Sequence, residues 1–289
     1  MRVACVQMRS GRHEPDNIAA MAELVREAAS QGASYVQTPE MTGLVERERK
    51  KLIAEISPDE GNPVFARASE LARELGIWLH IGSAAVKVDG TADNGKAYNR
   101  ASIFAPSGER IAVYDKIHMF DVDLDHGESW RESAVYQPGS SAVVTCVDDT
   151  MLGMAICYDL RFPDLFRREA VAGAAVLSAP AAFTRQTGEA HWHTLIRARA
   201  IENGAFMICA AQGGTHEDGR ETYGHSLVVD PWGRIVGEID HDEPGVLVCD
   251  IDIAESAKAR GRIPNLKNAR EFDLRIEDRE VAMPGRGAA

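Results

Sequence analysis

The sequence predicts an α/β fold in which helices cover a sheet, and three observations support this. Short apolar runs alternate along the chain with segments whose apolar residues recur at helical spacing. The chain has 289 residues, 45% of them hydrophobic, so it can bury a sizeable core as one domain. No close internal repeat or low-complexity linker divides it. We therefore expect one domain over residues 1–274 and a C-terminal tail over residues 275–289 that is loose or packs on a partner subunit.

In the first half of the chain, strands and helices alternate. The expected strands cover residues 2–8, 34–40, 77–84, 100–105 and 111–117. Between the first two strands, Asp16 is expected to cap a helix that Gly32 ends. A second helix is expected over residues 63–75. The stretch Pro-Ser-Gly-Glu between the last two strands has turn chemistry and predicts a hairpin.

The second half repeats the alternation. It predicts strands over residues 151–157, 174–178 and 206–211, separated by helices over residues 163–172 and 189–203. The turn 230–233 then joins two further strands, with Pro at its second position and Gly at its fourth. The polar segment 121–139 lies between the halves and is longer than a plain connection requires. Such segments are usually functional or disordered.

The composition excludes several classes of protein. The formal charge is -12 and the chain has no basic cluster, so a nucleic-acid partner is not expected. No apolar stretch reaches the roughly 18 residues of a membrane span, and the N-terminus lacks a signal peptide, so we expect a cytoplasmic protein with no membrane partner. The five cysteines have no regular spacing, which predicts free thiols rather than disulfides or a zinc site. A small-molecule ligand fits this composition.

Cys157 stands where an apolar strand ends and the chain turns polar, whereas the other four cysteines lie in or beside apolar runs. A helix is expected to start near Pro163, so the sulfur should lie near a helix N-terminus, which favours thiolate over thiol. Free backbone amides of the same turn, such as that of Tyr158, could stabilise an oxyanion. The alternative is a buried cysteine without chemistry, since buried cysteine is common.

Two other expected strands also end in charged residues, Glu40 and Lys116. Because ligands collect outside the carboxyl ends of strands in open α/β sheets, these side chains could converge with Cys157. A thiol, a carboxylate and an ammonium suffice for acyl transfer, with Glu40 moving protons and Lys116 stabilising an oxyanion. On the residues alone, solvated charges explain Glu40 and Lys116 equally well, because sequence spacing does not show convergence.

Seven segments, in order, resemble the nitrilase, or carbon-nitrogen hydrolase, superfamily. They are VACVQM, TPEM, YDKIHMFD, WRESAVYQPG, GMAICYDLRFPDLFR, AHWHTLIRARAIENGAF and YGHSLVVDPWGRI, and they span about residues 3–251. The resemblance implies a four-layer α-β-β-α sandwich and an active site without cofactor or metal. It also implies a catalytic triad of Glu40, Lys116 and Cys157, with Glu132 beside it to orient Lys116 or the nucleophilic water. Without the resemblance, Glu132 would be interpreted as a solvated loop carboxylate.

Within the superfamily, CYDLRFP resembles the amidase branch that includes the Nit proteins, because true nitrilases usually have Trp where this chain has Tyr158. The stretches FTRQTGEAHWHTLIRARAIEN, AAQGG and RETYGHSLVVDPWG resemble most closely the deaminated glutathione amidases. This implies a homodimer or larger homo-oligomer that hydrolyses a small carboxylate-bearing amide through a thioester on Cys157.

Several alternatives stay open at this point. The omega-amidases, which act on 2-oxoglutaramate, share much of the same pattern, and N-carbamoyl amide hydrolases and acyltransferases share the triad. A fold alone does not settle function, so an inactive binding protein on the same fold is the alternative from outside enzymes. A redox-sensing role for Cys157 is a further one, because a thiol of low pKa is easily oxidised.

Four further residues are candidates for contact with the substrate. Tyr158 and His191 are expected to bind it. Arg161 and Arg185 could pair with a substrate carboxylate, although each is as well explained as a surface or structural arginine. His191 and His193 could suggest a metal, but a two-residue step places them about 200° apart around a helix, which makes a poor chelate.

Overall fold

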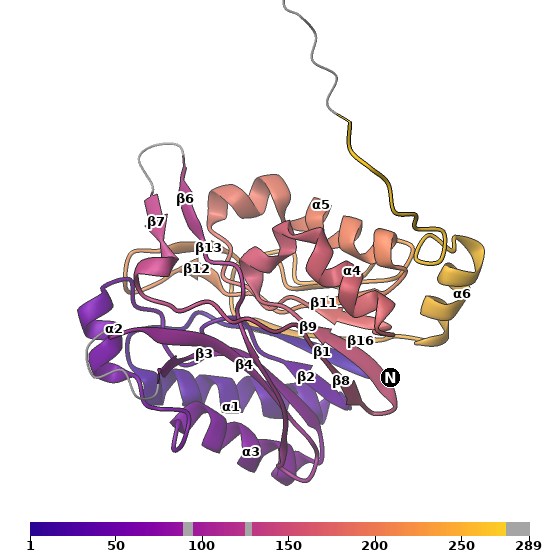
Figure 1. Ribbon diagram of the computed structural model, residues 1–289. Coiled ribbons are helices and arrows are strands. Elements are labelled where there is room, and N and C mark those ends of the chain that lie inside the picture. Colours follow the sequence, from indigo (N-terminus) through magenta and orange to yellow (C-terminus); the bar gives the residue numbers. More distant parts are fainter. Residues whose placement is uncertain (89–94, 125–128, 276–289) are drawn as a thin grey trace, which may run out of the picture.

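The computed structural model describes residues 1–88, 95–124 and 129–275 and contains two six-stranded sheets packed face to face (Figure 1). The first sheet has the order β16-β1-β2-β3-β4-β5, formed by Gly245–Asp250, Arg2–Gln7, Tyr35–Gln37, Trp78–Lys87, Ala97–Phe104 and Arg110–Asp115. The second has the order β15-β14-β11-β10-β9-β8, formed by Ile235–Glu238, Leu227–Val229, Phe206–Cys209, Val176–Ser178, Thr150–Met154 and Val143–Val147.

Helices cover both outer faces of the pair of sheets. α1 (Glu14–Ser30) and α3 (Pro63–Leu75) lie on the first sheet, and α4 (Pro163–Val171) and α5 (Arg185–Asn203) lie on the second (Figure 1). The layers therefore run α-β-β-α, which confirms the fold that the resemblance implies. Shorter elements lie outside the two sheets: α2 (Arg49–Glu55), α6 (Ala254–Arg262), the paired strands β6 (Asp121–Asp123) and β7 (Ser129–Arg131), and the paired strands β12 (Gly213–Thr215) and β13 (Glu221–Tyr223).

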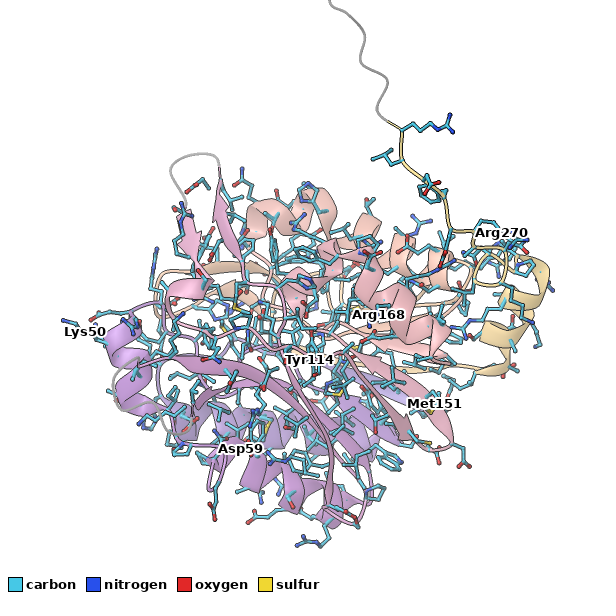
Figure 2. All side chains as sticks on the ribbon, in the orientation of Figure 1. Lys50, Asp59, Tyr114, Met151, Arg168 and Arg270 are labelled. Carbon is cyan, nitrogen blue, oxygen red and sulfur yellow. The ribbon has the colours of Figure 1, made fainter. Side chains whose placement is uncertain are left out.

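Strand β1 shows why the apolar runs become buried strands. Val3 and Cys5 belong to the core between the two sheets. Tyr114, which Figure 2 labels, belongs to the same core. Ala4 and Val6 point to the opposite face of the strand and pack in the cluster under α1 and α3. Successive side chains of a strand point to opposite faces, so a strand covered on both faces needs an uninterrupted apolar run.

Two helix starts differ from the expected ones. α1 begins at Glu14, and Asp16 lies inside it rather than capping it, because Pro15 supplies the fixed φ that suits a first helical turn. α5 begins at Arg185, earlier than expected, because the Thr184 hydroxyl caps it by accepting a hydrogen bond from a backbone N–H of the first turn. No helix in the described part of the chain is long and apolar enough to cross a membrane.

The polar segment 121–139 is not a plain loop. It contains β6, β7 and the 3-10 helix η2 (Glu132–Ala134), while residues 125–128 lie outside the described part. Strands β8 and β16 and helices α2 and α6 have no counterpart among the expected elements. The two strands lie at the sheet edges and are only half-buried, although their sequences, VVTCV and GVLVCD, are largely apolar and contain β-branched residues. From residue 276 onward, the expected tail lies outside the described residues.

His80 is a fully buried titratable group in β3. Its Nδ1 lies 2.7 Å from the Tyr35 hydroxyl, and its Nε2 has no hydrogen-bond partner among the described residues. Burial lowers the pKa of His80 to about 3, whereas the unfolded chain has a pKa of about 6.5. Between these two values the unfolded chain binds more protons, so the folded state loses stability as the pH falls below 6.5.

We expect His80 alone to lower the free energy of unfolding by about 2 kcal/mol between pH 7.5 and pH 5, because one proton difference is worth about 1.4 kcal/mol per pH unit. Urea unfolding at the two pH values measures this. In His80→Gln, the free energy of unfolding should fall by about 2 kcal/mol less between these pH values than in the wild type. In His13→Gln, at an exposed position, it should fall as much as in the wild type. An unchanged pH dependence in His80→Gln contradicts the prediction.

Candidate active site

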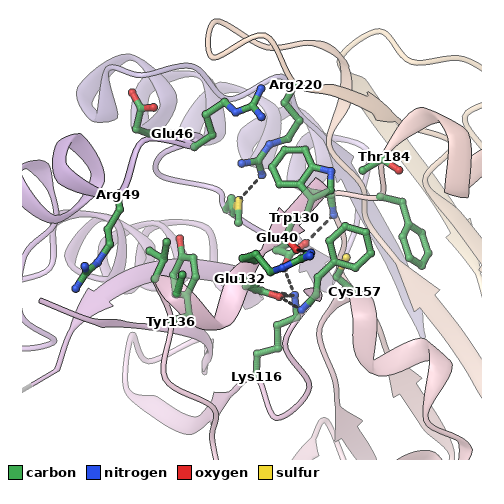
Figure 3. A pocket seen from close by; sticks show the side chains of 18 of the residues that line it. Glu40, Glu46, Arg49, Lys116, Trp130, Glu132, Tyr136, Cys157, Thr184 and Arg220 are labelled. Atoms are coloured by element: carbon green, nitrogen blue, oxygen red, sulfur yellow. Dashed lines mark hydrogen bonds and ion pairs between the residues drawn. The ribbon is translucent and has the colours of Figure 1, made fainter. Parts of the chain in front are cut away.

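Glu40, Lys116 and Cys157 meet at one point, although they come from three distant parts of the chain (Figure 3). β2, β5 and β9 each end before the residue concerned, so all three residues lie on the connections that follow. Lys116 Nζ lies 2.8 Å from Glu40 Oε1, and Cys157 lines the same cavity wall, close enough to Glu40 for the carboxylate charge to raise the pKa of the thiol. The exposed fraction is 2% for Glu40 and Lys116 and 6% for Cys157. The structure thus brings together a thiol, a carboxylate and an ammonium in a buried cluster.

Glu132 joins this cluster from η2. Both of its carboxylate oxygens lie 2.9 Å from Lys116 Nζ, and Phe120 N–H donates to its Oε2 at 2.6 Å. Asn99 on β4 connects the two carboxylates, because its Nδ2 donates to Glu40 at 2.8 Å and to Glu132 at 3.2 Å. Sequence reasoning missed Asn99. The only signal in the sequence is that Asn99, a polar residue, lies within a strand segment, AYNRASIF.

The loop that carries Glu40 is held at several points. Ala182 N–H donates to Glu40 Oε2 at 2.9 Å, so both oxygens of the carboxylate have partners. Met41 follows with a left-handed φ of 57°, and its N–H donates to Ser83 Oγ at 2.9 Å. Gln212 Nε2 donates to the main-chain oxygen of Glu40 at 3.0 Å. A left-handed φ is costly for methionine and persists where surrounding bonds over-determine it, so this loop fixes the Glu40 carboxylate in place.

Cys157 begins the 3-10 helix η3 (Cys157–Arg161), also with a left-handed φ, of 49°. The buried carboxylate of Asp159 organises this turn by accepting a hydrogen bond from Ile156 N–H at 2.9 Å. The same carboxylate accepts from the His118 N–H at 3.1 Å. Because His118 lies two residues after Lys116, Asp159 ties the turn of the thiol to the loop of the ammonium.

The ionisation of the cluster follows from burial and from the neighbouring charges. Burial and the charge of Glu40 raise the pKa of the Cys157 thiol well above its usual value. Burial alone would raise the pKa of Glu40 as well, but Lys116 and the hydrogen bonds to the carboxylate lower it on balance. Burial would lower the pKa of Lys116, but Glu132 and Glu40 raise it well above its usual value. The resting cluster is therefore thiol, carboxylate and ammonium.

This state corrects the expectation that the turn before a helix makes Cys157 a thiolate. The effects of burial and of the adjacent Glu40 charge on the pKa of the thiol outweigh that of the helix N-terminus, because Cys157 is buried and close to the carboxylate. The thiol must therefore lose its proton as it attacks a carbon atom. Glu40, whose carboxyl is ionised and whose charge acts on the thiol, is placed to take that proton.

A cavity of about 360 Å³ opens onto the cluster (Figure 3). Cys157, Lys116, Glu40 and Glu132 form part of its wall, and aromatic and basic side chains form much of the rest. Such a volume suits a small molecule, and the mixed lining suits one that carries charge.

Neither Tyr158 nor His191, both expected to bind substrate, lines this cavity. The Tyr158 ring packs edge-on against Phe120 and Phe162, with ring centroids 5.1 and 5.4 Å apart. Its backbone N–H has no acceptor among the described residues and stays available to an oxyanion. α5 turns His191 toward solvent, where its Nδ1 lies 3.3 Å from Arg161 Nη2. The structure therefore gives no cavity contact for either side chain.

The two arginines considered for carboxylate pairing also lie outside the cavity wall. The Arg161 guanidinium lies over the rings of Tyr158 and Phe183. Arg185 forms an ion pair with Asp242 at 2.7 Å, so a carboxylate of the protein already occupies it. The cavity wall instead contains Arg220, which sequence reasoning missed because no local pattern distinguishes it from a surface arginine.

Comparison with known proteins agrees with this geometry. The family model described as carbon-nitrogen hydrolase matches residues 2–260. The deaminated glutathione amidase of Yersinia enterocolitica is 38% identical over 270 residues, which cover 93% of this chain and 92% of that protein. The crystal structure of the C. elegans NitFhit protein has a TM-score of 0.85 at 32% identity and covers 93% of this chain and 65% of that chain. An amidase from Nesterenkonia sp. AN1, solved with acrylamide added to its active-site cysteine, has a TM-score of 0.75 at 26% identity over 91% of this chain and 98% of that chain.

Proposed function

The chain belongs to the carbon-nitrogen hydrolase family and is a hydrolase that acts on amides, and we propose that its substrate is deaminated glutathione. One observation carries the proposed chemistry: a buried thiol lies on the wall of the same cavity as a buried carboxylate and ammonium that are 2.8 Å apart. Relatives named deaminated glutathione amidase, at 36–38% identity over most of the chain, support the choice of substrate. Cleavage of the amide would release 2-oxoglutarate and cysteinylglycine.

In the first half of the proposed reaction, the acyl group moves to the enzyme. Glu40 takes the proton of the Cys157 thiol as the sulfur attacks the amide carbon. Negative charge develops on the carbonyl oxygen, where the Lys116 ammonium and the Tyr158 N–H stabilise it. When the carbon–nitrogen bond breaks, Glu40 gives the proton to the leaving nitrogen. The acyl group stays on the sulfur as a thioester.

In the second half, water removes the acyl group. Glu40 accepts a proton from the water as its oxygen attacks the thioester carbon, and the same donors stabilise the second oxyanion. As the carbon–sulfur bond breaks, the proton returns to the sulfur and restores the thiol. Glu132 holds Lys116 through two contacts of 2.9 Å. It keeps the ammonium directed at the oxyanion, rather than paired with Glu40 alone.

Assay of the purified protein on deaminated glutathione and on 2-oxoglutaramate, side by side, tests the substrate. Both reactions release 2-oxoglutarate, so one detection method serves for both. A kcat/KM at least about tenfold higher for deaminated glutathione supports the proposal, and the reverse order makes the protein an omega-amidase. Failure on both substrates favours the N-carbamoyl amide alternative. Absence of turnover on any amide favours an inactive binding protein.

Lys116→Ala is expected to lower kcat by about 10²-fold or more, as loss of one oxyanion donor does. KM should change far less, because the ammonium acts on charge that develops in the transition state. The melting temperature should also fall, since Glu40 and Glu132 lose their shared cation. Steady-state kinetics measure the first effect, with the exposed Lys258→Ala as the control. A change confined to KM contradicts the oxyanion role.

Three further features belong to the same proposal. Residues 1–274 act as one catalytic domain, which the core shared by both sheets supports. The protein is a homodimer or larger homo-oligomer, which exposed apolar side chains such as Ile201, Trp232 and Ile263 support. It works in the cytoplasm, in keeping with five free cysteines.

A further inference from the structure

One arginine of the cavity wall is buried without the partners that a buried arginine needs. Arg220 lies directly before β13, and its side chain is 9% exposed. It lines the same cavity as Cys157 and Lys116. A guanidinium carries five N–H donors and no acceptor, and buried donors are nearly always hydrogen-bonded.

The protein satisfies these donors poorly. Arg220 Nε has no acceptor among the described residues. Nη1 lies 3.2 Å from the sulfur of Met41, a weak acceptor, and Nη2 lies 3.5 Å from Asp218 Oδ2, at the limit of a hydrogen bond. By contrast, Arg100 binds Asp115 with two bonds, of 2.8 and 2.9 Å. The Arg220 guanidinium therefore retains N–H donors that an external carboxylate could satisfy.

A second guanidinium lies close by and shares an aromatic partner with the first. Arg220 Cζ lies 4.7 Å from the centre of the Trp130 ring, and Arg47 Cζ lies 5.3 Å from it. Arg47 is exposed and forms no ion pair with any described carboxylate. An indole ring holds each guanidinium in place through its face without using the N–H donors. Together Arg220, Trp130 and Arg47 form a cationic wall in a chain of net charge -12.

The position of this wall relative to Glu40 indicates which end of a substrate it faces. Figure 3 shows Trp130 between Arg220 and the cluster of Lys116 and Cys157. The contact of Arg220 with Met41, the residue after Glu40, places it on the side of the proton donor. The acid that protonates a leaving nitrogen must lie on the side of the leaving group. The exposed Arg47 extends the wall toward solvent.

We propose that Arg220, assisted by Arg47, binds the carboxylate of the leaving group, so that the site prefers amides whose amine part is a peptide with a free C-terminus. This rests on the proposed function and deepens it, because cysteinylglycine carries such a carboxylate and the ammonia released from 2-oxoglutaramate does not. Arg220 is thus a specificity residue for the amine side. The acyl part of the two substrates is the same, so the pair isolates the amine side of the site.

Arg220→Gln is expected to lower kcat/KM for deaminated glutathione by about 10²-fold, mainly through KM, because one charge-assisted contact made throughout the reaction is lost. The same variant should hydrolyse 2-oxoglutaramate within about twofold of the wild type, which also shows that it is folded. Arg220→Lys, which keeps the charge, should recover part of the loss. Arg26→Gln, at an exposed pair with Glu74, should leave both rates unchanged.

A third substrate tests the carboxylate contact directly: deaminated glutathione with its glycine carboxylate converted to the amide. On this amidated substrate, the kcat/KM of the wild type should fall by about the same factor as the substitution Arg220→Gln lowers kcat/KM on deaminated glutathione. The kcat/KM of the variant should not fall further on the amidated substrate, because both changes remove the same interaction. Two results would overturn the inference and leave the proposed function in place. One is an equal fall in kcat/KM of Arg220→Gln on deaminated glutathione and on 2-oxoglutaramate. The other is that the variant and the amidated substrate together lower kcat/KM by the product of their separate effects. Inactivity of the wild type on deaminated glutathione overturns the proposed function and the inference with it.

Discussion

Replacing Cys157 with alanine is expected to abolish thioester formation and to lower kcat/KM by at least about 10⁴-fold, the scale on which loss of a nucleophile acts in enzymes with a covalent intermediate. The fold should stay intact. Cys157 already occupies a left-handed conformation that alanine tolerates no worse, and its side chain loses one atom in a small buried site. Turnover of deaminated glutathione and mass spectrometry of the quenched enzyme measure the two effects.

The matched control is Cys146→Ala, at an exposed cysteine on β8, which should retain wild-type turnover. In the wild type, the quenched enzyme should gain the mass of one acyl group, and Cys157→Ala should gain none. Residual turnover of Cys157→Ala near the wild-type rate ends the assignment of the nucleophile.

Glu40→Gln is expected to lower kcat/KM by about 10³-fold or more, because an amide cannot accept the proton of Cys157 or that of the attacking water. The loss exceeds that of an ordinary proton-transfer residue, since Glu40 serves both halves of the reaction. The amide also fits its neighbours poorly. The carboxylate accepts hydrogen bonds from Lys116, Asn99 and Ala182, so the new NH₂ group must face an N–H donor.

A second measurement separates this role from a general loss of structure. The charge of Glu40 raises the pKa of the Cys157 thiol, so its removal should lower that pKa and allow iodoacetamide to alkylate Cys157 at lower pH than in the wild type. Turnover and alkylation should thus change in opposite directions. The exposed Glu74→Gln serves as control. If turnover stays within about tenfold of the wild type, Glu40 is not the base.

Local signals explain which elements could be predicted. α3 has the expected bounds because Asn62 caps its start and Gly76, in a left-handed conformation, ends it, and both signals are written in adjacent residues. Strand β1 was predictable because burial on both faces demands an apolar run. Strands β8 and β16 carry a similar apolar signal in VVTCV and GVLVCD, but their places at the sheet edges, paired with β9 and β1, come only from the tertiary structure.

The site divides along the same line. The resemblance names Glu40, Lys116, Cys157 and Glu132, but nothing in their spacing indicates distances of 2.8 and 2.9 Å between groups so far apart in the chain. Asn99 and Ala182 act through contacts that exist only after the sheets and loops have packed. Cys157 is a thiol rather than the expected thiolate, because its pKa is raised. The helix start that favours a thiolate can be predicted from adjacent residues, whereas burial and the nearness of Glu40 cannot.

The alternation of strands and helices follows from the sequence alone, since it depends on neighbours within a few residues, and the net negative charge follows from composition. The reactive side chains follow from the family resemblance of the segments that contain them. Tertiary packing settles that these side chains share one cavity wall, that the resting sulfur keeps its proton, and that Arg220 rather than Arg161 or Arg185 lines the cavity. Electrostatic effects depend on distance in space and on the exclusion of water, and both are set by contacts between residues remote in the chain.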